Sequence, residues 1–586
     1  MINTWNAGCA FDHGRVMAPF IKGFFMANES SEFDFDYVIV GSGFGGSVSA
    51  LRLAEKGYSV AVIEQGRRWT PQNLPKTSWQ FWDFIWSPQV GLRGFFKINL
   101  FKRVMVLSGC GVGGGSITYA QTLLVAPEEI WQQGTWKGLE DWQKTMPAYY
   151  DLAKRMLGVT ENRRRAPADD KLYEMAKVWG CEDTFKLENV GVFFGDDDKP
   201  QGAEYNDPYF GGAGPKRKSC NACGGCMVGC KYDSKNTLDK NYLYLAEQLG
   251  VEVKAETKVL DVSPIAGAID GSEGYRLTLR PTFKRFGEKT QITARSVIFS
   301  AASLGTQDLL LRMKDSGALP NLSEQLGKQV RTNSESLLGV RYPGSDLDLS
   351  TGIAIGSGIQ IDQFTHVEAT RYPSGSNIIS FLFTPLTGGK PGITRPLSWL
   401  GAVAKLLVTN PVKGLRALMP YRFANETMIF LVMQTVDAHI DFSLKRPWFW
   451  PFSKQMTSSS KRIPTFIPEA NNFTEKVAKA TDGIGLSSIS EILFNVPTTA
   501  HCMGGCCMGD TAKTGVIDNQ HRVHNYKNLF VIDGSTISSN LGVNPSLTIT
   551  ALAERAMSFI PPKEDGAQNV RHIQGDETKA QAVGEM

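Results

Sequence analysis

The segment "DYVIVGSGFGGSVSALRLAEKGYSVAVIEQG" constrains the fold more than any other part of the chain. The apolar run 37–40 predicts a buried strand, and a helix pattern follows it. Between them stand Gly41, Gly43 and Gly46 in G-x-G-x-x-G spacing. A second apolar strand ends at Glu64, where an acid would bind a ribose hydroxyl. Such glycines let the backbone approach a pyrophosphate, so the segment predicts a Rossmann-like unit that binds a dinucleotide.

A second glycine-rich stretch, "LSGCGVGGGSITYA" (107–120), helps to choose between NAD and FAD. Its glycines would let a backbone loop pass close to a flat cofactor. The apolar residues on both sides argue against a flexible loop, which is the alternative interpretation. The stretch therefore fits a cofactor that lies flat against the backbone.

The composition is that of a globular protein with no special attraction for polyanions. Apolar residues make up 42% of the 586 residues, and the formal net charge is +4, so no nucleic-acid partner is expected. No run of 18 apolar residues predicts a transmembrane helix, and the N-terminus has no signal pattern. Seven of the ten cysteines cluster at 220–230 and 502–507, which favours a reducing compartment and a cytoplasmic location.

Two further motifs lie in the second half of the chain. "VIFSAASLGTQDLLLR" (297–312) predicts a strand and a helix, and "HCMGGCCMGD" precedes "NLFVIDGSTISSNLGVNPSLTITALAERAM". With these four motifs in this order, the chain resembles the glucose–methanol–choline (GMC) family of FAD oxidoreductases. Within that family it is most similar to the cholesterol oxidase branch, and the resemblance covers most of residues 33 to 560.

The resemblance implies roles for individual residues. His501 takes the place of the active-site histidine, and Asn544 takes the place of the asparagine that partners it in the steroid branch. Glu426, in "NETMIFLVMQ", is offered for the glutamate base of double-bond isomerisation; a solvent-exposed turn glutamate is the alternative. Besides the first three glycines and Glu64, the residues implied at the cofactor are Gly115, Ser116, Val259, Asp533, Gly534 and Pro545.

The chemistry of alcohol oxidation suits these residue types. The hydroxyl proton must leave while a hydride moves from carbon to flavin N5. A histidine accepts a proton near neutral pH, and an asparagine can hold the oxygen in line by hydrogen bonding. A structural histidine at a glycine turn is the alternative for His501.

The stretch "SCNACGGCMVGCKYD" holds Cys220, Cys223, Cys226 and Cys230 at C-x2-C-x2-C-x3-C spacing. Short glycine-containing loops would let four thiolates converge on an iron–sulfur cluster. A zinc site and a reduced loop without metal are the alternatives, and zinc sites usually separate two C-x2-C units. A cluster would carry electrons to an external acceptor and would make the enzyme a dehydrogenase rather than an oxidase.

The second cysteine group, Cys502, Cys506 and Cys507, adjoins His501. Metal binding there would conflict with a catalytic histidine, so packing in a turn of small residues is the prediction.

The predicted fold class is α/β, with a Rossmann-like FAD-binding domain and a discontinuous substrate domain built on a mixed or antiparallel sheet plus helices. The FAD-binding domain is expected over 33–125, 236–340 and 500–560. The substrate domain is expected over 126–235 and 341–499, with a cysteine-rich insertion at 219–231. A disordered extension is expected over 1–32 and a polar tail over 563–586.

Three segments are unusually aromatic or amphipathic: 78–103, 397–419 and 446–452. Such stripes usually belong to a core. They could also form a lid over an apolar pocket, or a peripheral membrane contact from which a lipid is drawn. This second interpretation agrees with a sterol-like alcohol better than with a sugar.

Three functions remain from the sequence. The first is an FAD-dependent oxidoreductase that acts on a hydrophobic, sterol-like alcohol, with oxygen or an acceptor protein as electron acceptor. The second is a sugar or glycoside dehydrogenase that passes electrons through the cluster to a cytochrome or quinone. The third is a flavin-binding electron carrier or light-responsive module without alcohol chemistry, against which the pair His501 and Asn544 argues.

Overall fold

Two seven-stranded sheets organise the chain, and the first is built around the N-terminal strand. The computed structural model describes residues 33–265, 267–284, 286–388, 394–447, 452–459 and 463–563. In the first sheet β1 lies between β2 and β15, parallel to both, and β14 and β13 extend the sheet antiparallel beyond β15. Its strands are β1 (Phe35–Val40), β2 (Val60–Ile63), β12 (Glu252–Lys254), β13 (Thr257–Pro264), β14 (Tyr275–Pro281), β15 (Thr290–Phe299) and β27 (Leu529–Val531).

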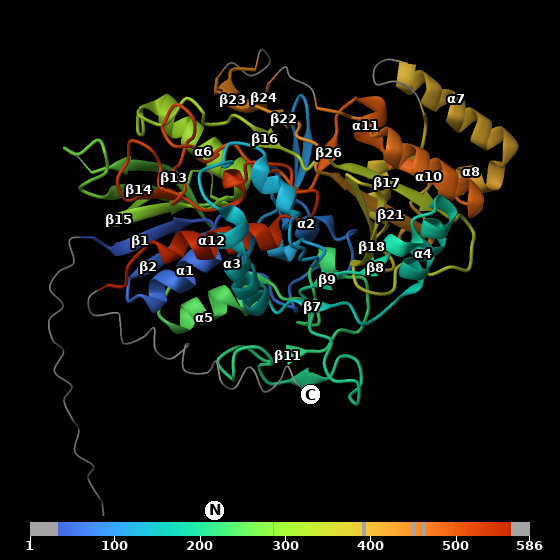
Figure 1. Ribbon diagram of the computed structural model, residues 1–586, viewed down its shortest axis with the longest axis horizontal. Coiled ribbons are helices and arrows are strands. Elements are labelled where there is room, and N and C mark those ends of the chain that lie inside the picture. The colour runs from blue at the N-terminus through green and yellow to red at the C-terminus, as the bar shows by residue number, and fades with distance from the viewer. Residues whose placement is uncertain are drawn as a thin grey trace, which may run out of the picture.

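Helices cover both faces of this sheet (Figure 1). On one face α1 packs against α5 and the C-terminal α12, and α12 packs against α3; α6 lies on the other face. Residues from both ends of the described chain therefore share one core. The helices are α1 (Phe44–Glu55), α3 (Trp142–Leu157), α5 (Tyr242–Gln248), α6 (Ala302–Ser316) and α12 (Ser546–Ser558).

The second sheet is antiparallel throughout, with the order β20-β25-β17-β21-β19-β18-β8. Its strands are β8 (Lys186–Leu187), β17 (Ser336–Arg341), β18 (Ile355–Asp362), β19 (Thr365–Thr370), β20 (Phe383–Pro385), β21 (Thr427–Gln434) and β25 (Ile484–Ser488). Helices α4 (Pro167–Trp179) and α10 (Pro468–Ala480) pack against it and against each other.

Strand β21 shows how this sheet serves two compartments. Its side chains alternate between the two faces, as in any strand. Phe430 and Val432 join the core beneath α4 and α10, whereas Ile429 and Leu431 line a cavity on the opposite face. The strand is thus apolar on both faces, because α4 and α10 pack against one face and the other face forms part of the cavity wall.

A three-stranded sheet joins the two halves of the molecule. Strand β6 (Met105–Gly109) pairs with β5 (Phe96–Leu100) and, in parallel, with β26 (Thr498–Thr499). This pairing places the second glycine-rich stretch, which begins within β6, beside the turn that carries His501.

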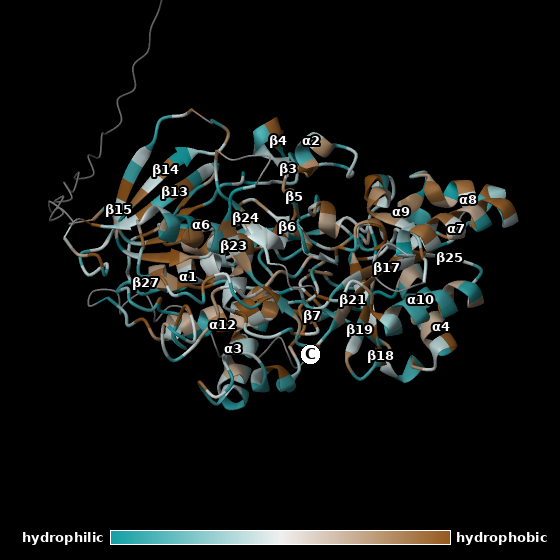
Figure 2. Cartoon of the chain, turned by 90° about the horizontal axis from the view of Figure 1, so that it is seen from above, coloured by the Kyte–Doolittle hydropathy of each residue, from teal (hydrophilic) through white to brown (hydrophobic). Residues whose placement is uncertain are grey.

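Helices α7 (Thr394–Thr409) and α8 (Pro411–Leu418) lie at the outer edge of the half that holds the second sheet (Figure 1). Figure 2 shows hydrophobic residues along both helices. The remaining elements are α2 (Phe81–Phe84), α9 (Phe423–Glu426), α11 (Ile489–Leu493), β3 (Trp86–Ser87), β4 (Leu92–Arg93), β7 (Thr160–Glu161), β9 (Asn189–Val190), β10 (Glu204–Tyr205), β11 (Arg217–Lys218), β16 (Val330–Arg331), β22 (His439–Ile440), β23 (Phe442–Lys445) and β24 (Gln455–Ser458), with short 3-10 helices at η1 (Pro88–Val90), η2 (Gly114–Ile117), η3 (Glu128–Gln132), η4 (Glu182–Thr184), η5 (Cys226–Val228), η6 (Leu238–Lys240), η7 (Asn377–Leu382) and η8 (Gly534–Thr536).

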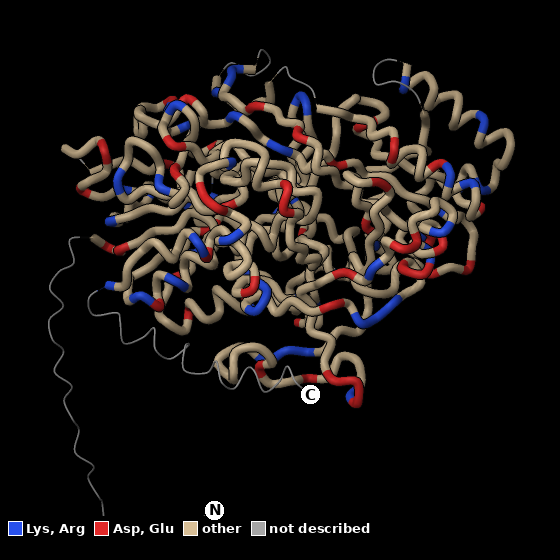
Figure 3. Tube along the Cα trace, in the orientation of Figure 1, with Lys and Arg blue, Asp and Glu red and all other residues tan. Residues whose placement is uncertain are grey.

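The predicted α/β class is confirmed, and so is the strand–glycine–helix order at the start of the first sheet. The expectations for residues 1–32, for most of 446–452 and for nearly all of 563–586 lie outside the described residues. Basic and acidic residues are mixed along the trace (Figure 3), in line with the small net charge. In the part of the chain that the structure describes, no helix is both long and apolar enough to cross a bilayer.

Candidate active site

The first glycine loop has the geometry of a nucleotide cradle. Gly41 follows β1 with a φ of 104°, and a Cβ there would overlap the Ser300 carbonyl. Gly46 is equally closed, because a Cβ would overlap the Gly41 carbonyl. A Cβ on Gly43, in contrast, would meet nothing within 4 Å. Two glycines therefore serve the fold, while the third faces open space at the N-terminus of α1.

The second glycine stretch lies directly against the first. A Cβ on Gly114 would come within 2.6 Å of Gly43 Cα. The buried Ser116 hydroxyl donates to the Gly113 carbonyl and accepts from the Leu238 N–H, which fixes the loop. Gly115 lines the cavity described below.

Glu64 is held at the end of β2. Its carboxylate accepts hydrogen bonds from the Ser42 hydroxyl, at 2.8 Å, and from the Ser42 and Gly66 N–H groups. Burial raises its pKa. Thr257 N–H donates to the Glu64 carbonyl, so β13, with the buried Val259, begins beside this acid.

Asp533 caps the turn after β27. Its carboxylate accepts from the Ser535 N–H at 2.8 Å and from the Thr306 hydroxyl at 2.5 Å. Burial raises its pKa. Asp533, Gly534 and Pro545 all line the same cavity, at the N-termini of α6 and α12.

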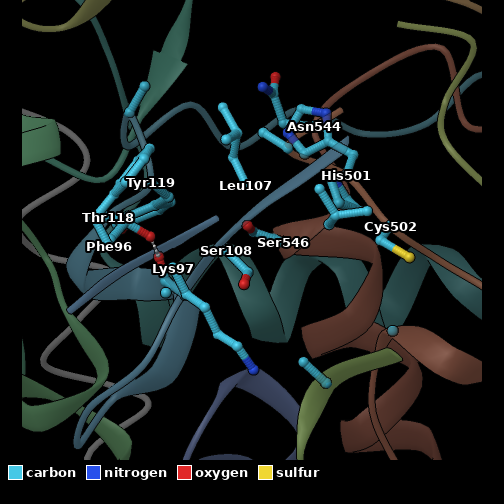
Figure 4. Close-up of a pocket in the computed structure, with 18 of the residues that line it drawn as sticks. Phe96, Lys97, Leu107, Ser108, Thr118, Tyr119, His501, Cys502, Asn544 and Ser546 are labelled. Carbon is cyan, nitrogen blue, oxygen red and sulfur yellow. Dashed lines mark hydrogen bonds between the residues drawn. The ribbon is translucent and has the colours of Figure 1, made fainter. Parts of the chain in front are cut away.

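One cavity of about 290 Å³ connects these loops with the second sheet. At one end it is lined by Gly43, Gly115 and Asp533, and at the other by apolar side chains of the second sheet and of η7. Figure 4 shows His501 and Asn544 next to each other in its wall, with Lys97, Thr118 and Tyr119 farther along. The apolar set comprises Leu337, Ile355, Ile379, Leu382, Phe383, Ile429 and Leu431.

His501 is oriented by a buried carboxylate that sequence reasoning missed. Its Nδ1 contacts Oε1 of Glu335, which is fully buried, and the other Glu335 oxygen accepts from the Ala500 N–H at 2.6 Å. Burial opposes a charge on the imidazole, but the Glu335 carboxylate outweighs it and raises the pKa of His501. With Nδ1 facing Glu335, Nε2 is left as the ring nitrogen free to exchange a proton.

A short segment before β17 holds both functional turns. The Thr332 carbonyl accepts from the Thr499 hydroxyl, next to His501. Asn333 accepts from the Gly542 N–H at 2.8 Å and donates to the Val543 carbonyl at 3.0 Å, next to Asn544. His501 and Asn544 are therefore fixed relative to each other although they come from separate loops.

Asn544, like His501, has a buried carboxylate as its neighbour. Its Nδ2 donates to Oε2 of Glu368 at 3.3 Å, and Glu368 lies on β19 with no exposed surface. Among the described residues, Asn544 Oδ1 is buried without a hydrogen-bond partner. A lone acid within the strand pattern "THVEAT" was the one signal that could have drawn attention to Glu368.

Glu426 lies away from the site. It is buried at the end of α9 and does not line the cavity. Its carboxylate lies 3.4 Å from Nη2 of the buried Arg341, on β17, and 3.6 Å from Nε of Arg422. A carboxylate committed to two guanidinium groups is not an available base, so the implied role of Glu426 needs correction.

The cysteine run lies beside the second glycine stretch. The buried Lys235 ammonium donates to the carbonyls of Ile117, Tyr119 and Cys226, which ties the run to the loop at the cavity. Cys220 and Cys226 are buried and burial raises their pKa, whereas Cys223 is exposed.

The four cysteines line a void of about 10 Å³. Within the described residues, however, no group of three or more histidine, cysteine or acidic side chains is arranged to hold a metal ion. The predicted iron–sulfur ligand set at Cys220, Cys223, Cys226 and Cys230 is thus not supported, since the thiols divide between the interior and the surface. Cys502, Cys506 and Cys507 pack in the turn beside His501, as expected.

Comparisons with known proteins agree with this geometry. A family model described as GMC oxidoreductase matches residues 452–553, and one described as an NAD(P)-binding Rossmann-like domain matches 39–71. The chain is 55% identical to a cholesterol oxidase of Acinetobacter baumannii over 91% of this chain and 95% of that protein. It is 44% identical to a cholesterol oxidase of Mycobacterium tuberculosis over 93% of each chain.

Solved structures with low sequence identity share the fold. A pyridoxine 4-oxidase from Mesorbium loti superposes with a TM-score of 0.56 at 13% identity, covering 89% of this chain and 99% of that one. A formate oxidase gives a TM-score of 0.54 at 13% identity, covering 89% and 97%. At this identity the likeness concerns the fold alone.

Proposed function

Because this chain belongs to the glucose–methanol–choline oxidoreductase family, in the cholesterol oxidase branch, we propose that it oxidises the hydroxyl group of a sterol. It is an FAD-dependent alcohol oxidoreductase. The observation that carries the proposal is a continuous cavity that leads from the glycine loops, past His501 and Asn544, to a wall of apolar side chains. A sugar would leave its hydroxyls without partners on that wall.

The residues at the glycine end fit FAD. Gly43 leaves open space where a diphosphate would lie, and Gly115 brings backbone to the cavity without a side chain. Glu64 would bind the ribose, and Asp533 and Gly534 would hold the ribityl or diphosphate region. When bound there, FAD supplies the hydride acceptor of the reaction.

His501 and Asn544 would have separate roles in the oxidation of the alcohol. His501 Nε2 would accept the hydroxyl proton, and Glu335 stabilises the protonated ring from the opposite nitrogen. Asn544 would hold the substrate oxygen in line for hydride loss. The apolar cavity excludes water, which strengthens both interactions.

We assign the isomerisation base to Glu368 in place of Glu426. Neither glutamate lines the cavity itself, but Glu368 contacts Asn544, which does. The ion-pair partner of Glu368 among the described residues is a histidine rather than an arginine. Glu368→Gln should therefore still oxidise a sterol but release the unconjugated ketone, which product analysis would distinguish by ultraviolet absorption.

Anaerobic mixing with a sterol tests the oxidation step. The wild-type flavin should bleach, and His501→Ala should keep its flavin but bleach at least ~100-fold more slowly, because the base is gone. His524→Ala is the matched control, since His524 binds the Gly509 carbonyl away from the cavity. Wild-type bleaching by His501→Ala would reject the assigned role.

Oxygen is the proposed electron acceptor. The two similar proteins are named oxidases, and the cysteine run gives no support for an electron-carrying cluster. Hydrogen peroxide should form in a one-to-one ratio with the ketone. Stoichiometric iron and sulfide in the purified protein would instead favour the dehydrogenase alternative.

We also propose that α7 and α8 touch a membrane from which the sterol is drawn. Leu400 and Val408 of α7 and Leu415 of α8 are exposed, Val408 by 83%. Nearby, exposed Phe381 contacts exposed Trp79, and Phe381 belongs to η7, which lines the cavity through Ile379 and Leu382. This surface thus adjoins the apolar end of the pocket.

A further inference from the structure

A buried charged cluster extends from Asn544 toward the surface. Glu368, already bonded to Asn544, lies with Oε1 3.5 Å from Nε2 of His366. The same Nε2 lies 3.5 Å from Oε1 of Glu188, and the other Glu188 oxygen lies 3.9 Å from Nζ of Lys186. Glu368, His366 and Glu188 are all buried, whereas the Lys186 side chain is 57% exposed.

The fold leaves space for this row of groups, which runs from Glu368 through His366 and Glu188 to Lys186. His366 and Glu368 are two residues apart on β19 and so share one face of the strand. Glu188 follows β8, at the edge of the same sheet, and Gly358 of β18 lies between. A Cβ on Gly358 would overlap Glu188 Oε1 and come within 2.7 Å of His366 Cε1, so only a glycine leaves the space open.

The hydrogen bonding of the cluster is incomplete. Within the described residues, both nitrogens of His366 and one oxygen each of Glu188 and Glu368 are buried without a well-formed hydrogen bond. Buried polar atoms are normally satisfied, so such exceptions need an explanation. A proton that moves along the row would occupy these atoms in turn.

The chemistry of the proposed function supplies a reason. Oxidation of a secondary alcohol to a ketone breaks the C–H bond and the O–H bond of the same carbinol group. FAD, when bound, would supply the hydride acceptor, and the proton must reach solvent. A bulky substrate fills the apolar cavity and excludes water from it. The proton therefore needs a way out other than the cavity.

We propose that Glu368, His366 and Glu188 form a proton relay that carries the proton accepted by His501 to solvent beside Lys186. The Glu368 carboxylate lies close enough to the imidazole to stabilise its charge, so the proton passes from His501 to Glu368 and from there through His366 to Glu188. His366 and Glu188 act through Glu368 and do not touch the substrate. The inference rests on the proposed function only in requiring that an alcohol is oxidised in the cavity.

The charges around the row agree with a mobile proton. Burial opposes a charge on His366, but Glu368 and Glu188 outweigh it and raise its pKa, while burial raises the pKa of Glu188. Both shifts favour the protonated form, of His366 through the two carboxylates and of Glu188 through burial. The other titratable groups that face the row are Lys186 at its outer end and His501, with Glu335, at its inner end.

A single anaerobic turnover in weakly buffered solution tests the relay. A pH dye reports proton release while chromatography of quenched samples reports the ketone. In the wild type, protons should be released together with the ketone. In Glu188→Gln and His366→Gln, proton release should lag the ketone by ~10-fold or more, as when a proton-transfer group is lost, and the double variant should lag no further than either single variant.

Two more variants complete the test. Gly358→Ala should produce the same lag by separating Glu188 from His366, and Lys186→Met, at the surface, should slow release several-fold. Glu491→Gln is the matched control, because Glu491 is a buried carboxylate of the same half that binds Ser336 instead of the row. In Glu491→Gln, protons should be released together with the ketone, as in the wild type.

The outcomes separate the relay from the proposed function. No ketone from the wild type would reject the alcohol chemistry. Ketone with unchanged proton release in every correctly folded relay variant, Lys186→Met included, would overturn the relay. Flavin content and melting temperature identify the correctly folded variants.

Discussion

Glu335 sets the proton affinity of His501, because its buried carboxylate contacts the imidazole Nδ1. A neutral ring is needed to accept the hydroxyl proton, so activity should rise with pH through the raised pKa of His501. The carboxylate thus makes His501 a stronger base and shifts the acidic limb of the pH profile upward.

Glu335→Gln should move that acidic limb to lower pH and lower kcat by ~10-fold or more, since the ring also loses its orientation. The pH dependence of kcat/KM checks the shift. Glu491→Gln serves as control, because that acid binds Ser336 in the same region. An acidic limb that stays in place would mean that another group titrates.

His521 should make the fold acid-sensitive. It is fully buried, its Nδ1 faces the Val531 carbonyl at 3.0 Å, and burial lowers its pKa to about 4. Between that value and the ~6.5 of an unfolded histidine, the unfolded chain binds more protons. The free energy of unfolding therefore falls as pH drops through this window, by on the order of 3 kcal/mol.

His521→Gln should remove most of this dependence. Urea unfolding of the holoprotein at pH 7 and pH 4.5, followed by flavin fluorescence, gives the two free energies. The loss between them should be smaller in the variant than in the wild type. Equal losses would assign the acid sensitivity to carboxylates instead.

At the scale of elements, the first strand, glycine turn and helix were predictable because their signals are local. Gly41, Gly43 and Gly46 are contiguous with the strand and helix that they join. Glu426 was misplaced for the opposite reason. Its partner Arg341 lies on β17, and only the pairing of β17 with β21 brings the two together.

Glu335 and Glu368 were missed for the same physical reason. Each meets its partner, His501 or Asn544, across more than 150 residues of sequence. No spacing rule within a strand or helix reports such a contact. The sequence thus yielded the two catalytic candidates but not the buried acids that set their properties.

The glycine turn supports a prediction that separates folding from cofactor binding. Gly41→Ala should prevent stable folding, because its Cβ overlaps the Ser300 backbone and its φ is 104°. Gly43→Ala should fold with nearly the wild-type melting temperature as apoprotein but retain little FAD, since its Cβ would enter the open space that we propose for the diphosphate. Thermal scans with and without FAD check both variants.

A failure of either expectation is informative. If Gly43→Ala binds FAD normally, the diphosphate does not lie against this residue. If Gly41→Ala folds, the turn can shift away from Ser300.

At the scale of the molecule, the exposed apolar residues of α7 and α8 predict partition to lipid. Leu400→Asp with Leu415→Asp should reduce sedimentation with phosphatidylcholine vesicles at least ~10-fold, because two exposed apolar side chains that would insert into lipid become charges. Oxidation of a water-soluble alcohol should stay unchanged. Ile269→Asp, which alters an exposed residue of the other half, is the control.

Equal vesicle binding by the double variant and the wild type would show that these helices do not form the membrane contact. Loss of soluble-alcohol turnover as well would instead show that the helices support the pocket itself.

The packing of α1 against α12 has a consequence for biosynthesis. Arg52 of α1 forms an ion pair at 2.7 Å with Glu554 of α12, 502 residues away. At 5–20 residues per second, a ribosome needs roughly 25 to 100 s between these two side chains. During that time α1 can pack against α5 but lacks the cover that α12 provides. The packing around the first sheet is therefore completed only when the C-terminal helix has left the ribosome.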